Sequence, residues 1–122
     1  MIVAVSSVGK SMESELDAHF GRAAQYLIVD SETLKYSIID NPAQNVSIGV
    51  GIAAAQTLID RQVEAVITGQ IGPNVLIQFS DARVQMYQGI TGTVHDNIKA
   101  FRHHRLSVIK SSGPDHAAMR GV

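Results

Sequence analysis

Cysteine and tryptophan are both absent from this chain of 122 residues, and only 5% of its residues are aromatic. Without cysteine, the chain forms no disulfide and offers no thiolate to a metal ion. No apolar run in the sequence is long enough to cross a bilayer. The first residues also lack the basic region, apolar core and cleavage site of a secretion signal. We therefore expect a cytoplasmic protein that makes no contact with a membrane.

Charged residues make up 17% of the chain, and their distribution is uneven. Residues 1–82 contain four lysine or arginine residues against nine acidic residues, whereas residues 83–122 contain six against two. The basic last third indicates an anionic ligand or partner, although a solvated helix face followed by a disordered tail would give the same count. Tyr26, Tyr36 and Tyr87 lack the interleaved basic residues of a nucleic-acid surface, so no nucleic-acid partner is expected.

The pattern of apolar residues predicts a single α/β domain. Apolar runs predict strands near residues 2–5, 25–30, 34–39, 65–68 and 84–87. A short polar link between the second and third runs favours an antiparallel hairpin. Helical spacing follows Gly49, Gly72 and Thr93. This order of elements predicts a three-layer α/β/α fold, with a five-stranded mixed sheet between helices.

Each predicted helix has one side that is expected to pack on the sheet. The residues on those sides are Gly51, Ile52, Ala55, Leu58 and Ile59 in the first helix, Leu76 and Phe79 in the second, and Val94, Ile98 and Phe101 in the third. Thr93 and Asp96 have the spacing of a capping box that opens the third helix. A Ser-Ser-Gly-Pro sequence at residues 111–114 breaks regular structure, so a mobile tail is expected from about residue 111.

The segment from His19 to Ala23, with the sequence His-Phe-Gly-Arg-Ala, joins an anion-binding side chain to a turn. Arg22 offers a planar, permanently charged set of donors, and Gly21 allows a ligand to approach the backbone. The same residues have an alternative interpretation, in which Phe20 fills the core and Arg22 pairs with Asp17.

Three loops follow predicted parallel strands, at residues 6–11, 69–74 and 88–93. Ligands of open α/β sheets bind beyond the carboxyl ends of such strands. The helices that begin near Pro73 and Thr93 are expected to direct unpaired N–H groups toward this rim, where an anion would be stabilised. The glycines of these loops have an alternative role, because they also permit tight turns.

Several enzyme classes are excluded by missing residues. Gly9-Lys10-Ser11 imitates the end of a phosphate-binding loop, but Ala4 stands where that loop requires its first glycine. The first strand carries no carboxylate for a two-metal nuclease. The chain also lacks a Gly-x-Ser-x-Gly sequence and a cysteine nucleophile. We therefore expect a protein that is not an enzyme.

Five segments, taken in order, resemble the nitrogenase iron-molybdenum-cofactor biosynthesis family, which includes NifX-like proteins, the C-terminal domain of NifB and the orange protein. These segments are residues 1–7, 17–23, 40–42, Gly49 with Gly51, and 69–73. The resemblance covers residues 1–104 and leaves residues 105–122 as a C-terminal extension that we expect to be mobile. It implies a ribonuclease-H-like layout whose second strand is antiparallel.

The resemblance also implies a non-catalytic carrier or scaffold that binds an anionic metal–sulfur cluster noncovalently. The cluster would be an iron-molybdenum-cofactor precursor or a molybdenum-copper sulfide, and it must bring its own sulfides because the chain has no cysteine. The candidate binding residues are His19, Phe20, Gly21, Arg22, Gly69, Gly72, Pro73 and Asn74, with His19 as the candidate metal ligand. Basic groups of the last helix are expected to assist.

A cofactor-assembly or acceptor protein is the expected partner, and the expected state is a monomer or a weak homodimer. The alternative function is a small protein-interaction or phosphate-binding module that carries no cluster.

Overall fold

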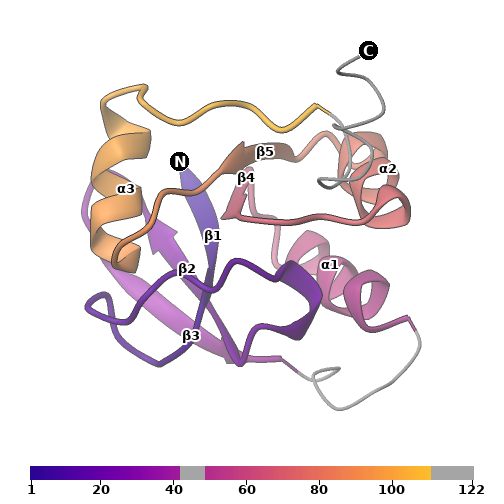
Figure 1. The fold of residues 1–122 in the computed structure, drawn as a ribbon, viewed down its shortest axis with the longest axis horizontal. Coiled ribbons are helices and arrows are strands. Elements are labelled where there is room, and N and C mark those ends of the chain that lie inside the picture. Colours follow the sequence, from indigo (N-terminus) through magenta and orange to yellow (C-terminus); the bar gives the residue numbers. More distant parts are fainter. Residues whose placement is uncertain (42–48, 111–122) are drawn as a thin grey trace.

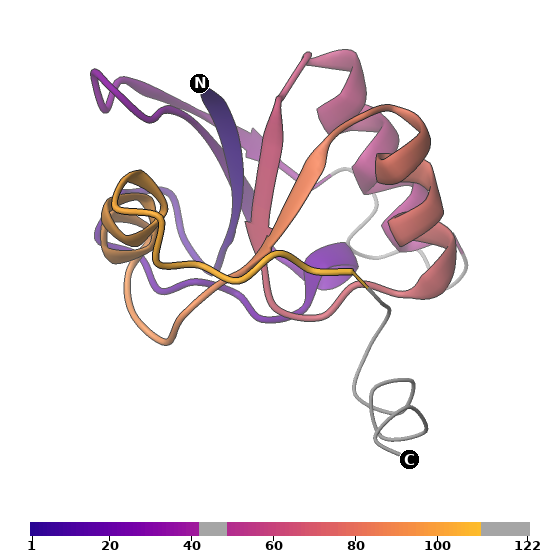
Figure 2. The same cartoon turned by 90° about the horizontal axis from the view of Figure 1, so that it is seen from above.

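The computed structural model describes residues 1–41 and 49–110 as a five-stranded mixed sheet with helices on both faces (Figures 1 and 2). The elements are β1 (Ile2–Ser7), η1 (Phe20–Arg22), β2 (Gln25–Asp30), β3 (Tyr36–Asp40), α1 (Val50–Asp60), β4 (Ala65–Thr68), α2 (Pro73–Asp81), β5 (Gln85–Gln88) and α3 (Val94–Arg102). Helices α1 and α2 cover one face of the sheet, and α3 lies on the other (Figure 2). The predicted three-layer fold is confirmed.

The strand order is β3-β2-β1-β4-β5. Strand β2 is antiparallel to both β1 and β3, whereas β4 is parallel to β1 and to β5. The antiparallel second strand agrees with the expected layout. No helix in the described part of the chain is long and apolar enough to cross a bilayer.

Strand β1 lies at the centre of the sheet, as its continuous apolar sequence predicts. Ala4 packs into the core beneath α1 and α2, while Val3 and Val5 pack into the core beneath α3. All three are fully buried. A central strand that is covered on both faces holds the loop after its carboxyl end in a fixed position.

The buried side of α1 differs from the predicted one. Ile52 is 45% exposed, whereas Ala54, Ala55 and Leu58 are fully buried. The prediction for Ile52 is wrong because α1 also packs against α2, so its buried stripe is turned toward both neighbours. Three other apolar residues predicted to pack on the sheet, Ile59, Leu76 and Phe101, are only half-buried.

Residues 105–110, which the sequence placed in the C-terminal extension, return along the outer edge of β5. The N–H of Gln88 donates to the carbonyl of Ser107 at 2.8 Å, and the N–H of Ile109 donates to the carbonyl of Met86 at 2.8 Å. Residues 105–110 therefore pack with the domain rather than extend from it. The predicted mobile tail from residue 111 lies outside the described residues.

The predicted capping box at the start of α3 is confirmed. The N–H of Asp96 donates to Thr93 Oγ1 at 3.0 Å, and the N–H of Thr93 donates to Asp96 Oδ2 at 3.0 Å. The hydrogen bond from the Thr93 N–H lowers the pKa of the Asp96 carboxyl below its usual value. The ionised carboxylate is thus the form that stabilises the helix start.

We predict that Asp96→Ala lowers the melting temperature at pH 7 and that the difference from wild type shrinks as the solution is acidified. A carboxyl with a lowered folded-state pKa stabilises the fold above its unfolded pKa, about 4, and loses this effect as pH falls through the folded value. Circular dichroism melts between pH 7 and 2.5 measure this. Asp81→Ala removes an exposed carboxylate at the end of α2 and is the matched control. A pH-independent difference for Asp96→Ala would contradict the prediction.

Candidate functional site

The two glycine-containing loops singled out in the sequence meet at the carboxyl edge of the sheet. The N–H of Gln70 donates to the carbonyl of Ala18 at 2.6 Å, and the N–H of Phe20 donates to the carbonyl of Gln70 at 3.3 Å. These bonds form a short parallel bridge between His19 and Gln70. The segments 19–22 and 69–74, which are far apart in sequence, are therefore brought together.

Hydroxyl groups tie the same loops to the ends of β1 and β4. Ser6 Oγ lies 2.6 Å from the carbonyl oxygen of Asp17 and 2.7 Å from Thr68 Oγ1. Ser6 and Thr68 are completely buried. The turn that leads into His19 is thus anchored to the last residues of two central strands.

Gly69 and Gly72 have different roles in this arrangement. A Cβ atom built on Gly69 would lie 2.4 Å from the carbonyl oxygen of Ala18, so only glycine allows the two backbones to pack this closely. A Cβ atom built on Gly72 would meet nothing within 4 Å. Gly69 is therefore required by packing, whereas Gly72 borders open space at the start of α2.

Phe20 holds the site in place from the core. Its ring lies 5.3 Å from the rings of both Tyr26 and Phe79, and the residue is 2% exposed. Its N–H is bound to Gln70, and its carbonyl accepts a hydrogen bond from Tyr26 Oη. Phe20 can therefore act on a ligand only by positioning its neighbours. This part of the alternative interpretation, in which Phe20 fills the core, is confirmed.

Tyr26 and Asn41 hold the turn of the candidate site in place, and neither was predicted as a site residue. Asn41 Nδ2 donates to the carbonyls of Gly21 at 2.8 Å and Ala23 at 2.9 Å, so one amide holds both ends of the turn. Burial, with a smaller effect from the charge of Asp17, raises the pKa of Tyr26 well above its usual value and keeps its hydroxyl a donor. The Asp-Asn-Pro sequence at residues 40–42 was the available signal for Asn41.

The first turns of α1 and α2 converge on the same turn. A Cβ atom on Gly21 would lie 2.8 Å from Gly51 Cα, and one on Gly51 would lie 2.9 Å from Val75 Cγ2. No side chain caps either helix at its N-cap residue, Gly49 or Gly72. The positive ends of two helix dipoles, which no side chain of the described residues caps at the N-cap, are therefore directed to the region beside η1 (Figure 2).

The N-terminus of α3 is occupied by the protein itself. The N–H of Val94 donates to the carbonyl of Ser14 at 2.8 Å, and the N–H of His95 donates to the carbonyl of Met12 at 2.9 Å. The N–H of Asp96 is used by the capping box. The prediction that this helix directs free N–H groups to the rim is wrong, because the loop after β1 folds back over it.

Arg22 projects from η1 as an exposed side chain. Its guanidinium makes no hydrogen bond or ion pair with any residue that the structure describes. The alternative pairing with Asp17 is wrong, since the Asp17 carboxylate accepts the N–H of His19 at 2.9 Å and lies 3.8 Å from His19 Nδ1. Arg22 is thus a cation without an internal partner, beside two open helix starts.

His19, Pro73 and Asn74 are exposed at the rim. The Asp17 carboxylate lies 3.8 Å from Nδ1 of His19, and Nε2 has no partner among the described residues. Pro73 at the first position of α2 has no N–H, so Asn74 supplies the first backbone donor of this helix. Within residues 1–41 and 49–110, no three histidine, cysteine or acidic side chains are grouped so that they could hold a metal ion.

The basic end of α3 lies away from this rim. Arg102 lines a cavity with Met1 and Ser31, which stand at the start of β1 and after the end of β2. That is the opposite edge of the sheet. The expectation that basic groups of the last helix assist the site is therefore wrong for Arg102.

Comparison with known families tests the resemblance found in the sequence. A sequence profile described as dinitrogenase iron-molybdenum cofactor matches residues 1–104. The chain belongs to the dinitrogenase iron-molybdenum cofactor family. An uncharacterised family relative from Methanocaldococcus jannaschii is 31% identical over 96 residues, which cover 76% of this chain and 81% of that protein.

Solved structures extend this assignment. The apo form of the orange protein from Desulfovibrio gigas has a TM-score of 0.88 and 28% identity, covering 93% of this chain and 96% of that one. A NifB-type protein from Thermotoga has a TM-score of 0.81 and 30% identity, covering 93% and 97%. Both comparisons support a role for this family member that is related to the iron-molybdenum cofactor.

We predict that Gly69→Ala destabilises the protein by about 1–3 kcal/mol, the usual cost of forcing an extra carbon into a packed position. The added methyl would displace the Ala18 backbone. Gly72→Ala is the matched control and should have nearly wild-type stability, because its methyl enters open space. Urea unfolding measures both variants. Equal stability of the two would contradict the roles assigned to these glycines.

Proposed function

We propose that this protein is a non-catalytic carrier or scaffold that holds an anionic metal–sulfur cluster noncovalently. The observation that carries the proposal is the exposed Arg22, which has no partner among residues 1–41 and 49–110 and stands beside two helix starts that none of these residues caps with a side chain. A permanent cation and two positive dipole ends at one rim favour a ligand of negative charge. The family assignment supplies the class of ligand.

The cluster reaches this protein as cargo with its own sulfides. The chain has no thiolate, and the described residues include no group of three histidine, cysteine or acidic side chains that could hold a metal ion. The available groups therefore suit binding of the cluster by charge and hydrogen bonds rather than by direct ligation of its metal ions. Arg22 and the N–H groups near Gly72 and Asn74 would neutralise the sulfide surface. His19 would add one imidazole.

We extend the proposal to the cargo and its route. The cargo is an iron-molybdenum-cofactor precursor or a molybdenum-copper sulfide, delivered by or to a cofactor-assembly or acceptor protein. The orange protein and the NifB-type protein share this fold across more than nine-tenths of the present chain, at 93% coverage each. A simple phosphate-binding module is the second candidate, because the same open helix starts would accept phosphate.

We predict that Arg22→Ala weakens cluster retention by about tenfold or more, since a hydrogen bond to a charged group contributes about 1.5–3 kcal/mol. The melting temperature should be nearly unchanged, because Arg22 has no ion pair within the described residues. Anaerobic incubation with thiomolybdate and copper, followed by metal analysis of the desalted protein, measures retention. Arg61→Ala, an exposed arginine at the end of α1, is the matched control.

The outcome distinguishes the two candidate functions. Wild-type protein that retains phosphate in equilibrium dialysis but no molybdenum or copper after desalting supports the phosphate module. Wild-type metal content in Arg22→Ala, together with a large fall in melting temperature, would make Arg22 a structural residue.

We further predict a graded release of cluster as ionic strength rises, because exposed charges are screened by salt over a Debye length of about 10 Å at 0.1 M. Cluster absorbance during a salt titration measures this. Cluster retention that does not change with salt but is lost between about pH 7 and 5 would contradict this prediction and indicate ligation by histidine. An imidazole gains its proton in that range and loses the lone pair that binds metal. His19→Ala would then abolish retention, whereas His95→Ala should leave it unchanged.

A further inference from the structure

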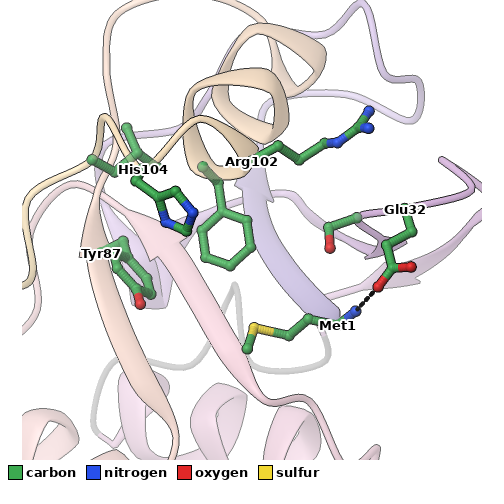
Figure 3. Close-up of a pocket in the computed structure, with 8 residues that line it drawn as sticks. Met1, Glu32, Tyr87, Arg102 and His104 are labelled. Atoms are coloured by element: carbon green, nitrogen blue, oxygen red, sulfur yellow. Dashed lines mark ion pairs between the residues drawn. The ribbon is translucent and has the colours of Figure 1, made fainter.

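A cavity lies at the edge of the sheet opposite the proposed cluster site, beside the end of α3, the start of β1 and the end of β2. Its volume is about 410 Å³ (Figure 3). The lining residues that carry the argument are Ser31, Tyr87, Phe101, Arg102, His104 and Leu106. The proposed cluster site follows the opposite end of β1, so this cavity is distinct from it. Six residues of β1 span roughly 20 Å at about 3.3 Å each.

The floor of the cavity is aromatic. The rings of Tyr87 and Phe101 are packed edge to face, with centroids 5.1 Å apart and an interplanar angle of 82°. Leu106 adds an aliphatic side chain from the segment that returns along β5. A flat apolar ligand can pack on such a surface and gain both burial and ring contacts.

Three polar groups around this floor have no partner in the part of the chain that the structure describes. They are the guanidinium of Arg102, the imidazole of His104 and the hydroxyl of Ser31. The Ser31 residue is 5% exposed. By contrast, Tyr87 Oη already donates to Gln85 Oε1 at 2.5 Å. The cavity thus combines an apolar floor with free polar groups, and the side chains of Arg102 and His104 are exposed to solvent and to an entering ligand.

We propose that this cavity binds a small monocarboxylate with an aromatic or similarly flat apolar body. The carboxylate would take the paired donors of the Arg102 guanidinium, and the ring would lie against Tyr87 and Phe101. A volume of about 410 Å³ is at the small end of ligand sites, which measure about 300–1,000 Å³. The ligand is therefore a compact molecule rather than a nucleotide or a peptide.

The surrounding charges favour one negative charge over two. Figure 3 places Glu32 and Arg102 on the same side of the cavity. The C-terminal end of α3, with its negative dipole end, is also close by. Glu32 and the C-terminal end of α3 would repel a phosphate dianion more strongly than a monocarboxylate. The single charge of a monocarboxylate can be balanced by Arg102 alone. Glu32 itself lies 3.8 Å from the ammonium of Met1.

The proposal is tested with benzoate, and with benzamide as its neutral isostere, in two-dimensional ¹⁵N NMR titrations of the full chain. Benzoate should shift the amide signals of Ser31, Tyr87 and Leu106 in a saturable way. Benzamide should bind at least tenfold more weakly. Because the chain has no tryptophan, quenching of tyrosine fluorescence gives an independent readout.

Arg102→Gln should weaken benzoate binding about tenfold and leave benzamide binding unchanged. Arg61→Gln removes a distant exposed arginine and should change neither. Amide spectra of both variants show whether the fold is intact. Leu106→Ala should weaken both ligands alike, because it removes apolar contact without removing charge.

Three results would overturn the proposal. Benzoate and benzamide could bind equally, no saturable shift could appear at the cavity amides, or benzoate could shift only Gly72 and Asn74 at the opposite edge. The last result would support a general anion site at the proposed cluster rim instead. Because the two sites lie at opposite edges, the cavity test does not depend on the cluster test.

Discussion

The close backbone packing of Gly69 against Ala18 is the constraint on which the candidate site depends. It lets the loop after β4 form hydrogen bonds to the turn before η1, and these bonds set the position of Arg22 relative to α2. Asn41 then fixes the turn from the other side through the carbonyls of Gly21 and Ala23. Backbone contacts therefore form the rim, and the charged side chain of Arg22 is positioned by them.

The features that were predicted correctly from the sequence are those that depend only on residues close together in the chain. The continuous apolar run of β1 and the capping box of α3 both depend on neighbouring residues, and both are confirmed. Ile52 was misplaced because the orientation of α1 depends on its contact with α2, which its own periodicity does not encode. Asn41 was missed because its partners stand at Gly21 and Ala23, far away in the sequence.

The N-terminus of α3 also shows that contacts between distant segments cannot be predicted from local sequence. Thr93 and Asp96 predicted where the helix begins, and this was correct. Whether its N–H groups were free depended on the path of the loop after β1, which covers them with the carbonyls of Met12 and Ser14. Helices α1 and α2 carry glycine at the N-cap and receive no side-chain cap there from the described residues, whereas the start of α3 is covered by the loop after β1.

The segment at residues 105–110 also decides how this protein can associate with itself. A strand at a sheet margin offers unpaired backbone groups to other chains, and Ser107 and Ile109 occupy those of β5. Strand β3, with Tyr36 43% exposed and Ile38 41% exposed, is left as the margin without such a cover among the described residues. Strand addition through one margin joins two copies about a twofold axis and then stops, whereas two open margins would allow endless growth. Pairing residues 105–110 with β5 thus occupies backbone groups through which another chain could add a strand at this margin.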